Sequence, residues 1–136
     1  MTHVHHVHLF SRDLTAAVAW YKSALDAEVC YDGDFGGSRN VFMKIGTGRI
    51  HLYAQSPRDH GKGVVHHIGI RTTDLASLYS RLLAMGVALR SGIREFGNWR
   101  YIMCPAPDEV LLELFQIDTE SMPAELARYF GDDTDK

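Results

Sequence analysis

Four side chains of this 136-residue chain are of types that hold metal ions, namely His6, His51, His67 and Glu113. Each stands in a short run that alternates between apolar and other residues, as half-buried β-strands do. Because a strand sends alternate side chains to opposite faces, the apolar neighbours should face a helix and the four polar residues the open side. Two sheets that curl toward one another would bring all four to one point.

The chemistry of this set is that of a transition-metal site. Three imidazoles and one carboxylate, with no thiolate, suit Zn, Ni, Co, Fe or Mn better than Mg or Ca. The ligand types do not choose among these five ions. Four protein ligands close a tetrahedral site, so a catalytic ion would need five or six coordination to leave positions for water or substrate.

An internal repeat supports the grouping. Residues 6–14 and 67–75 each open with a histidine, alternate, and close with Asp-Leu, at an offset of 61 throughout. Residues 50–53 and 112–115 correspond in the same way, with an offset of 62. Nearly the same offset thus relates two separate pairs of segments, which indicates a duplicated chain.

Each unit should contain one strand, a helix and three further strands. Asp13 and Asp74 are well placed as helix N-caps. Gly86 suits the left-handed end of the second helix, and Asp26 holds the matching place after the first. The expected strands cover residues 3–10, 28–32, 39–46 and 49–55, then 64–72, 88–93, 98–104 and 109–117. A short helix from Pro123 to Phe130 and a frayed acidic tail should follow.

Composition bounds the class of protein. Hydrophobic residues at 46% and charged residues at 23% are ordinary globular values. The net charge of −3 and scattered basic residues argue against nucleic acid as a partner, and no apolar run is long enough for a membrane span. Cys30 and Cys104 form neither a disulfide framework nor a metal pair, and the N-terminus lacks signal-peptide features, so we expect a cytoplasmic protein.

Each of the four predicted ligands could instead be an ordinary strand residue that binds no metal. Taken singly, a strand histidine is more often an ordinary residue than a ligand, and a strand glutamate is usually solvated; the shared register favours ligation. His3, His5 and His66 are interpreted as solvated or edge residues, and His8 as a rim residue of the open face. The histidine cluster at residues 3–8 superficially suggests a cupin, but no nearby carboxylate completes that set.

The chain resembles the vicinal oxygen chelate superfamily, which includes glyoxalase I, methylmalonyl-CoA epimerase, fosfomycin-resistance enzymes, extradiol dioxygenases and metal-free bleomycin-binding proteins. The resemblance covers residues 3 to about 117. It lies in His-Val-His-Leu and His-Ile-Gly-Ile at the two strand starts, the two Asp-Leu helix starts, Ala19-Trp20-Tyr21, and Pro107-Asp108 before Leu112-Glu113-Leu114. Carried over residue by residue, the family's ligand positions are His6, His51, His67 and Glu113.

The resemblance implies an α+β fold of two βαβββ modules, residues 3–56 and 64–117, that form a curved mixed sheet around a metal-binding cleft. Residues 1–117 would be one glyoxalase-like domain, and residues 118–136 a C-terminal helix and tail. Departures are His51, where glyoxalase I usually has a carboxylate and epimerases often an amide, and Asp26 and Glu109, where glycine is usual.

The implied function is that of a lyase or isomerase of the glyoxalase/epimerase type. One divalent metal ion would bind two neighbouring oxygens of a small molecule, with an enolate-like intermediate. Glu113 and His51 would be the acid/base residues, and His6 and His67 the anchors of the ion. A ring-cleaving non-haem Fe(II) dioxygenase and a drug-binding resistance protein remain alternatives. The resemblance also implies a homodimer.

Overall fold

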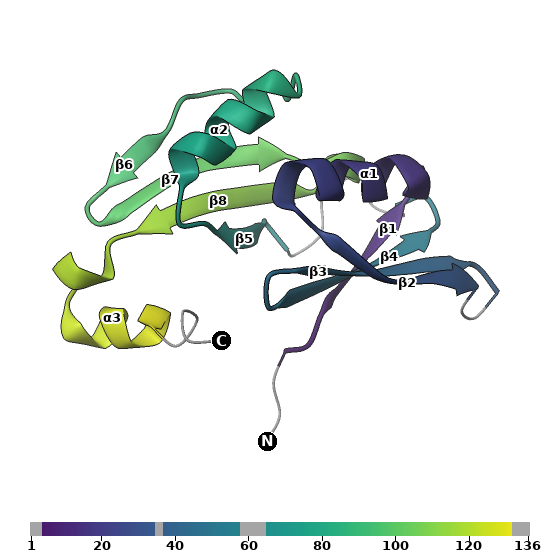
Figure 1. The fold of residues 1–136 in the computed structure, drawn as a ribbon, viewed down its shortest axis with the longest axis horizontal. Helices are drawn as coiled ribbons and strands as arrows, with labels where there is room; N and C mark the ends of the chain where they lie inside the picture. Colours follow the sequence, from purple (N-terminus) through teal and green to yellow (C-terminus); the bar gives the residue numbers. More distant parts are fainter. Residues whose placement is uncertain (1–3, 35–36, 58–64, 132–136) are drawn as a thin grey trace. The chain divides into compact units, whose positions relative to one another are not determined.

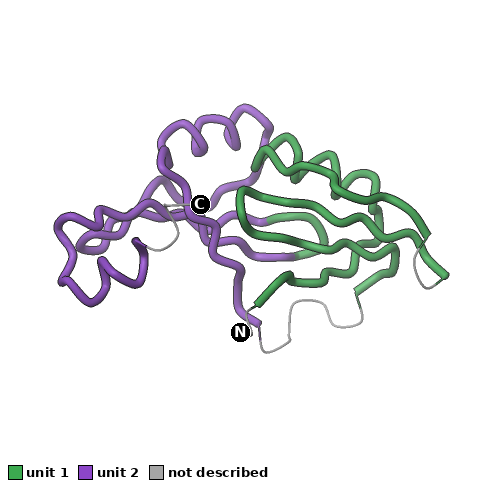
Figure 2. Tube along the Cα trace, turned by 60° about the horizontal axis from the view of Figure 1, so that its bottom comes forward, with its two compact units in different colours: residues 1–64, 106–109 green, residues 65–105, 110–136 purple. Residues whose placement is uncertain are grey.

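The computed structural model describes residues 4–34, 37–57 and 65–131. Two compact units divide the chain, one from residues 1–64 with 106–109, the other from residues 65–105 with 110–136 (Figure 2). Within the described ranges no helix is long and apolar enough to cross a membrane. The two cysteines are free, and burial raises the pKa of the Cys104 thiol to about 11.

The first unit is a four-stranded mixed sheet with one helix across it (Figure 1). Its elements are β1 (Val7–Ser11), α1 (Leu14–Leu25), β2 (Glu28–Asp34), β3 (Arg39–Ile45) and β4 (Gly48–Ala54). The strand order is β1-β4-β3-β2, with β1 parallel to β4 and the other pairs antiparallel. Its core is apolar: Leu14, Ala17, Tyr21 and Ala24 of α1, with Val41, Met43, Ile50 and Leu52 of the sheet, are buried.

The second unit repeats this arrangement. Its elements are β5 (Ile68–Arg71), α2 (Leu75–Ala84), β6 (Arg94–Phe96), β7 (Trp99–Pro105) and β8 (Leu111–Ile117), in the order β5-β8-β7-β6. The short helices η2 (Thr119–Ser121) and α3 (Ala124–Gly131) follow, and α2 and α3 lie on opposite sides of the sheet (Figure 1). The α+β class and the two βαβββ modules are therefore confirmed. In each unit we call the sheet face opposite α1 or α2 the open face.

The predicted caps are confirmed in both units. The Asp13 carboxylate accepts from the Ala16 amide at 3.1 Å, and the Asp74 carboxylate accepts from the Ser77 amide at 3.0 Å. The hydrogen bond from the Ser77 amide lowers the pKa of Asp74. After α1, Asp26 has a left-handed φ of 54°, and Gly86 has φ 78° after α2. An aspartate tolerates that conformation less well than glycine does.

The link between β7 and β8 belongs to the first unit. It contains the 3-10 helix η1 (Pro107–Glu109), where Asp108 and Glu109 have φ of 61° and 64°. The Asp108 carboxylate accepts from the backbone N–H of Arg12 at 3.0 Å and from its guanidinium at 3.1 Å. Glu109 thus adopts the left-handed backbone that its place at a usual glycine position implied.

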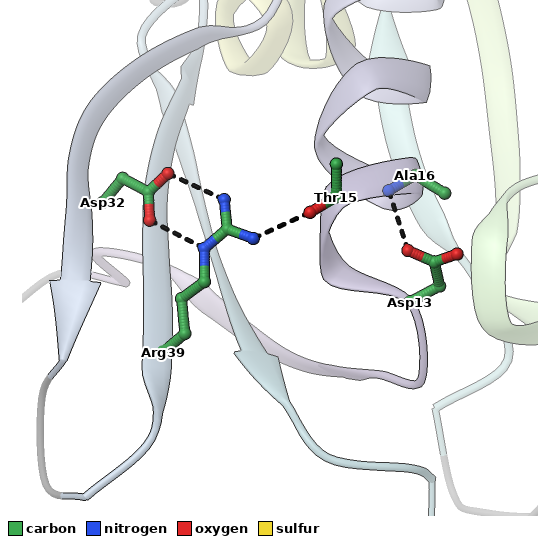
Figure 3. Close-up of polar contacts among 5 residues, drawn as sticks. All are labelled: Asp13, Thr15, Ala16, Asp32 and Arg39. Carbon is green, nitrogen blue, oxygen red and sulfur yellow. Dashed lines mark hydrogen bonds and ion pairs between the residues drawn. The ribbon is translucent and has the colours of Figure 1, made fainter.

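A polar cluster ties the β2–β3 hairpin to the first turn of α1 (Figure 3). The Arg39 guanidinium donates two hydrogen bonds to the Asp32 carboxylate, each 2.8 Å, and one of 2.8 Å to the Thr15 hydroxyl. The hydrogen bond from Arg39 lowers the pKa of Asp32. These contacts tie the start of β3 to β2 and to the start of α1.

One predicted strand is wrong. Residues 88–93 form no strand, with bends at residues 90–92, and the strand begins instead at Arg94. The hairpin with β7 turns at the two residues Gly97-Asn98, because Phe96 pairs with Trp99, and Gly97 has φ 55°. A two-residue turn fixes hairpin register, so pairing must start at its flanks. The strands predicted at 3–10 and 64–72 begin later, at Val7 and Ile68. The expected acidic tail lies beyond the described residues.

Candidate metal centre

The first unit contributes His6 and His51. His6 lies just before β1 and is exposed, while His51 lies half-buried in β4. Their rings stack with centroids 3.6 Å apart and planes 11° apart. On its other side His51 stacks against Phe42 of β3, at 3.9 Å and 19°. The neighbouring strands therefore hold the His51 ring between two flat surfaces, which limits its rotation.

The environment of His51 in the first unit favours its neutral form. Burial lowers the pKa of His51, and the neighbouring imidazoles of His6, His8 and His5 lower it further when they are charged. A metal ligand must be a neutral imidazole. His51 is therefore held in the form that can bind a cation without first losing a proton at pH 7.

The second unit contributes His67 and Glu113. His67 precedes β5, and Glu113 lies in β8, where it pairs with Gly69 of β5 and Met103 of β7. The His67 Nε2 atom lies 4.0 Å from the Glu113 Oε2 atom, with the side chains 35% and 20% exposed. This is too long for a hydrogen bond. Two ligand atoms that each lie about 2.1 Å from one ion are at most about 4.2 Å apart, so the pair fits a shared cation.

The register is the same in both halves. His8 pairs with His51 between β1 and β4, and Gly69 pairs with Glu113 between β5 and β8. Each anchor histidine thus lies two residues before the partner of the second ligand. The sequence repeat places the two pairs equivalently within their own units. The structure therefore collects the four predicted residues as two pairs, one in each unit.

A second histidine accompanies each anchor. His5 and His6 have their Nδ1 atoms 3.1 Å apart, and His66 and His67 have theirs 2.7 Å apart. In a neutral imidazole one nitrogen donates and the other accepts. If the anchor's Nδ1–H donates to its neighbour, the anchor's Nε2 keeps the lone pair that a metal needs, as in ligating histidines whose other ring nitrogen donates to a partner. The tautomers are inferred from this network.

His5 and His66 were interpreted from the sequence as solvated or edge residues. Both are exposed, yet their rings contact the anchors. Their spacing could have indicated a role beside the anchors, because His5 and His66 stand 61 residues apart, as His6 and His67 do. In the described part of the chain, the nitrogens of His5, His6 and His51 all lie within 4.8 Å of one another.

The third strand of each unit lines the open face. Trp99 and Tyr101 alternate with the buried Ile102 and so share the face of Glu113, whereas Arg100 points to the other face. In the first unit Asn40 is buried and pairs with Tyr53 of β4. The open face beside Glu113 therefore carries two aromatic side chains, those of Trp99 and Tyr101.

Residues 3–114 match the sequence pattern of the glyoxalase/bleomycin resistance protein/dioxygenase superfamily. The chain therefore belongs to this superfamily, as the resemblance to the vicinal oxygen chelate group predicted. No curated protein matches it significantly in sequence.

Similar solved structures support the fold. A glyoxylase/bleomycin resistance protein/dioxygenase domain from Frankia sp. EAN1pec is 23% identical, with a TM-score of 0.76, covering 87% of this chain and 99% of that one. The fosfomycin resistance protein FosX from Listeria monocytogenes is 22% identical, with a TM-score of 0.74, covering 88% and 97%. A variant of that protein was solved with Mn(II) and 1S,2S-dihydroxypropylphosphonic acid; it is 23% identical, with a TM-score of 0.73, covering 88% and 95%.

Proposed function

We propose that this protein is a metal-dependent enzyme that acts on a small molecule with two neighbouring oxygens. His6, His51, His67 and Glu113 would hold one divalent ion, of Zn, Ni, Co, Fe or Mn. The observation that carries the proposal is the His67–Glu113 pair, whose Nε2 and Oε2 atoms lie 4.0 Å apart and whose side chains are partly exposed to solvent. In the first unit the ring nitrogens of His6 and His51 lie within 4.8 Å of one another. Their rings are stacked, so the exposed His6 ring would have to turn before both nitrogens could point at one ion. The Mn(II) in a structurally similar protein is consistent with such an ion.

When bound, the metal would act as a Lewis acid toward substrate oxygens. Glu113 would move the proton, since its carboxylate is the one anionic group among the four proposed ligands. The side chain is 20% exposed and lies among the rings of Trp99 and Tyr101. His6 and His67 would anchor the ion, and His51 would be the fourth ligand or a second acid/base. This arrangement suits a lyase or isomerase of the glyoxalase/epimerase type.

A second candidate is a resistance enzyme. Several of the structurally similar proteins are fosfomycin resistance proteins. On this alternative the same residues would handle an epoxide-bearing drug, with no proton taken from carbon. A ring-cleaving dioxygenase is the third candidate and would require iron, a catechol and oxygen.

One experiment separates these candidates. The protein is purified without a His-tag or chelators, its metal content is measured, and it is assayed with 2-oxo, 2-hydroxy, acyl-CoA and catechol compounds and with fosfomycin. Turnover of a 2-oxo, 2-hydroxy or acyl-CoA compound supports the first proposal. Turnover of fosfomycin would instead support the resistance enzyme, and turnover of a catechol with oxygen would support the dioxygenase. A protein that binds none of the five ions refutes all three.

Metal affinity should depend on pH. Protons compete with the metal for imidazole nitrogens, whose ordinary pKa is about 6.5. The affinity is therefore expected to be nearly constant above pH 7 and to fall steeply below about pH 6.5. Competition titrations with a chromophoric chelator between pH 8 and pH 5 measure this. A flat affinity over that range would remove histidine from the coordination sphere.

The free energy of unfolding of the metal-free protein should decrease as the pH falls below about 6.5. The folded chain holds the pKa of His51 below the ordinary value, so the unfolded chain binds this proton more readily. The contribution of His51 to stability is complete above about pH 6.5 and is lost as the pH falls through the lowered value.

We further propose a homodimer. β2 is an edge strand of seven residues, mostly exposed, and it carries the apolar side chains of Val29 and Tyr31 at 37% and 41% exposure. Exposed edges of this kind favour pairing with another chain. Light scattering at micromolar concentration is expected to give twice the mass of 15.3 kDa. A monomer with metal bound would contradict this prediction.

A further inference from the structure

The second unit contains a cavity of about 480 Å³ that reaches Glu113. It lies on the open face, and every lining residue belongs to that unit. The lining comes from the end of β6 and its turn to β7, from β7 and β8, and from α3 with the two residues Met122 and Pro123 before it. The residues are Phe96, Gly97, Asn98, Trp99, Tyr101, Glu113, Met122, Pro123 and Leu126.

The segment that supplies the wall residues Met122, Pro123 and Leu126 is held by contacts near both of its ends. At the start, the Asn98 amide donates to the Ser121 hydroxyl at 2.7 Å. At the end, the Arg71 guanidinium donates to the Phe130 carbonyl. The Phe130 ring packs edge-on against Trp99, with centroids 5.3 Å apart. The cavity is therefore a built feature of the fold, with walls from segments distant in sequence.

The lining is apolar except at one end. Phe96, Trp99, Met122, Pro123 and Leu126 present hydrocarbon or ring surface, and the lining residues that the structure describes include no lysine, arginine or histidine. Among these described residues Glu113 is the one charged member, and the Asn98 amide is already bonded to Ser121. An anionic group buried at the apolar end, away from Glu113 and the proposed metal, would lose its hydration without compensation.

We propose that this cavity binds an uncharged, ring-sized apolar substituent of the substrate, with the reacting oxygens at the Glu113 end. The volume lies within the range of about 300–1,000 Å³ typical of small-molecule sites. The substrate class would then be aryl- or branched-alkyl-substituted 2-hydroxy or 2-oxo compounds. A small phosphonate would gain nothing from this cavity. The assignment of the oxygen end rests on the proposed function; the apolar end does not.

Exposure at the mouth agrees with this occupant. Phe96 is 80% exposed and Leu126 is 48% exposed, although both are large apolar side chains on the cavity wall. A bound ring would cover apolar surface of these residues, and each square ångström removed from water contributes about 25 cal/mol.

Two matched ligands and two matched variants test the proposal. 3-Phenyllactate and lactate carry the same vicinal oxygens and charge and differ by the phenyl ring. Calorimetry on the Mn²⁺-loaded parent should show 3-phenyllactate bound at least about tenfold tighter. Leu126→Asp should reduce this ratio to about twofold or less, by placing a charge in the apolar wall. Leu83→Asp is the control, because Leu83 lies on α2 at 51% exposure, outside the cavity lining.

A metal-free arm separates this proposal from the proposed function. Benzyl alcohol, which has the ring without the second oxygen, is titrated into metal-free protein, and the indole N–H signals of Trp99 and Trp20 are followed by NMR. A saturable shift of Trp99 alone, abolished by Leu126→Asp, supports the cavity even if no metal binds. Equal affinities of the parent for the two acids, or a Trp99 signal that benzyl alcohol does not move, would overturn the proposal. An unchanged preference in Leu126→Asp would also overturn it.

Discussion

Glu113→Gln should yield a folded protein with weakened metal binding and essentially no turnover. The amide keeps the size of the side chain but removes the charge and the basic oxygen. Loss of a positioned acid/base group typically costs about 10²- to 10⁴-fold in rate. The fold should survive, because the side chain is partly solvated and its nearest ligand partner, His67, lies 4.0 Å away.

The measurement combines circular dichroism, metal stoichiometry and the turnover number on the best substrate of the panel. Glu28→Gln is the matched control, since Glu28 also lies on a strand but is exposed and outside the candidate site. The control should match the parent in all three measurements. A Glu113→Gln variant with parental turnover would show that Glu113 does not move the proton.

The repeat explains why so much of the fold could be predicted. A duplicated pattern constrains each element twice, so a cap at Asp13 predicts one at Asp74, and both are confirmed. Strand alternation then fixes which residues share a face, because the period of two allows no intermediate placement. The positions of Glu113 beside Gly69 and of His51 beside His8 follow from the same register.

Contacts between distant segments could not be predicted. The sequence indicated a helix from Pro123 to Phe130, and α3 covers Ala124–Gly131. What it packs against depends on Arg71, which is 59 residues before its partner Phe130, and on the ring of Trp99. Local propensity contains no information of this kind. The cavity beside Glu113 was therefore not predicted.

The misplaced strand has a local physical cause. Residues 88–93 contain enough apolar residues to resemble a strand, but the turn at Gly97-Asn98 sets the pairing of Phe96 with Trp99. Gly97 accepts the positive φ of this turn without strain. The turn thus determined the strand position more strongly than the strand propensity of residues 88–93 did. The Gly97-Asn98 pair in the sequence already indicated this turn.

The anchor histidines provide the sharpest test of the candidate metal centre. His6→Ala and His67→Ala should each lower metal affinity by more than about 100-fold, because even the loss of an outer partner of a ligand typically costs 10- to 100-fold. Both side chains are exposed or half-exposed, so each substitution should change the free energy of unfolding by less than about 0.5 kcal/mol. The loss would then belong to the metal and not to the fold.

His8→Ala is the matched control for these variants. His8 lies in β1, two residues after His6, and shares the open face with it. Its ring centroid is 6.4 Å from that of His51, whereas the His6 centroid is 3.6 Å from it. It should keep the metal. His51→Gln should be milder than either anchor variant, because relatives often have an amide at that place, and it should alter the rate or the preferred ion. Metal-to-protein ratios of the four variants decide the matter. If His6→Ala and His67→Ala retain as much metal as His8→Ala, the four residues do not form a metal centre.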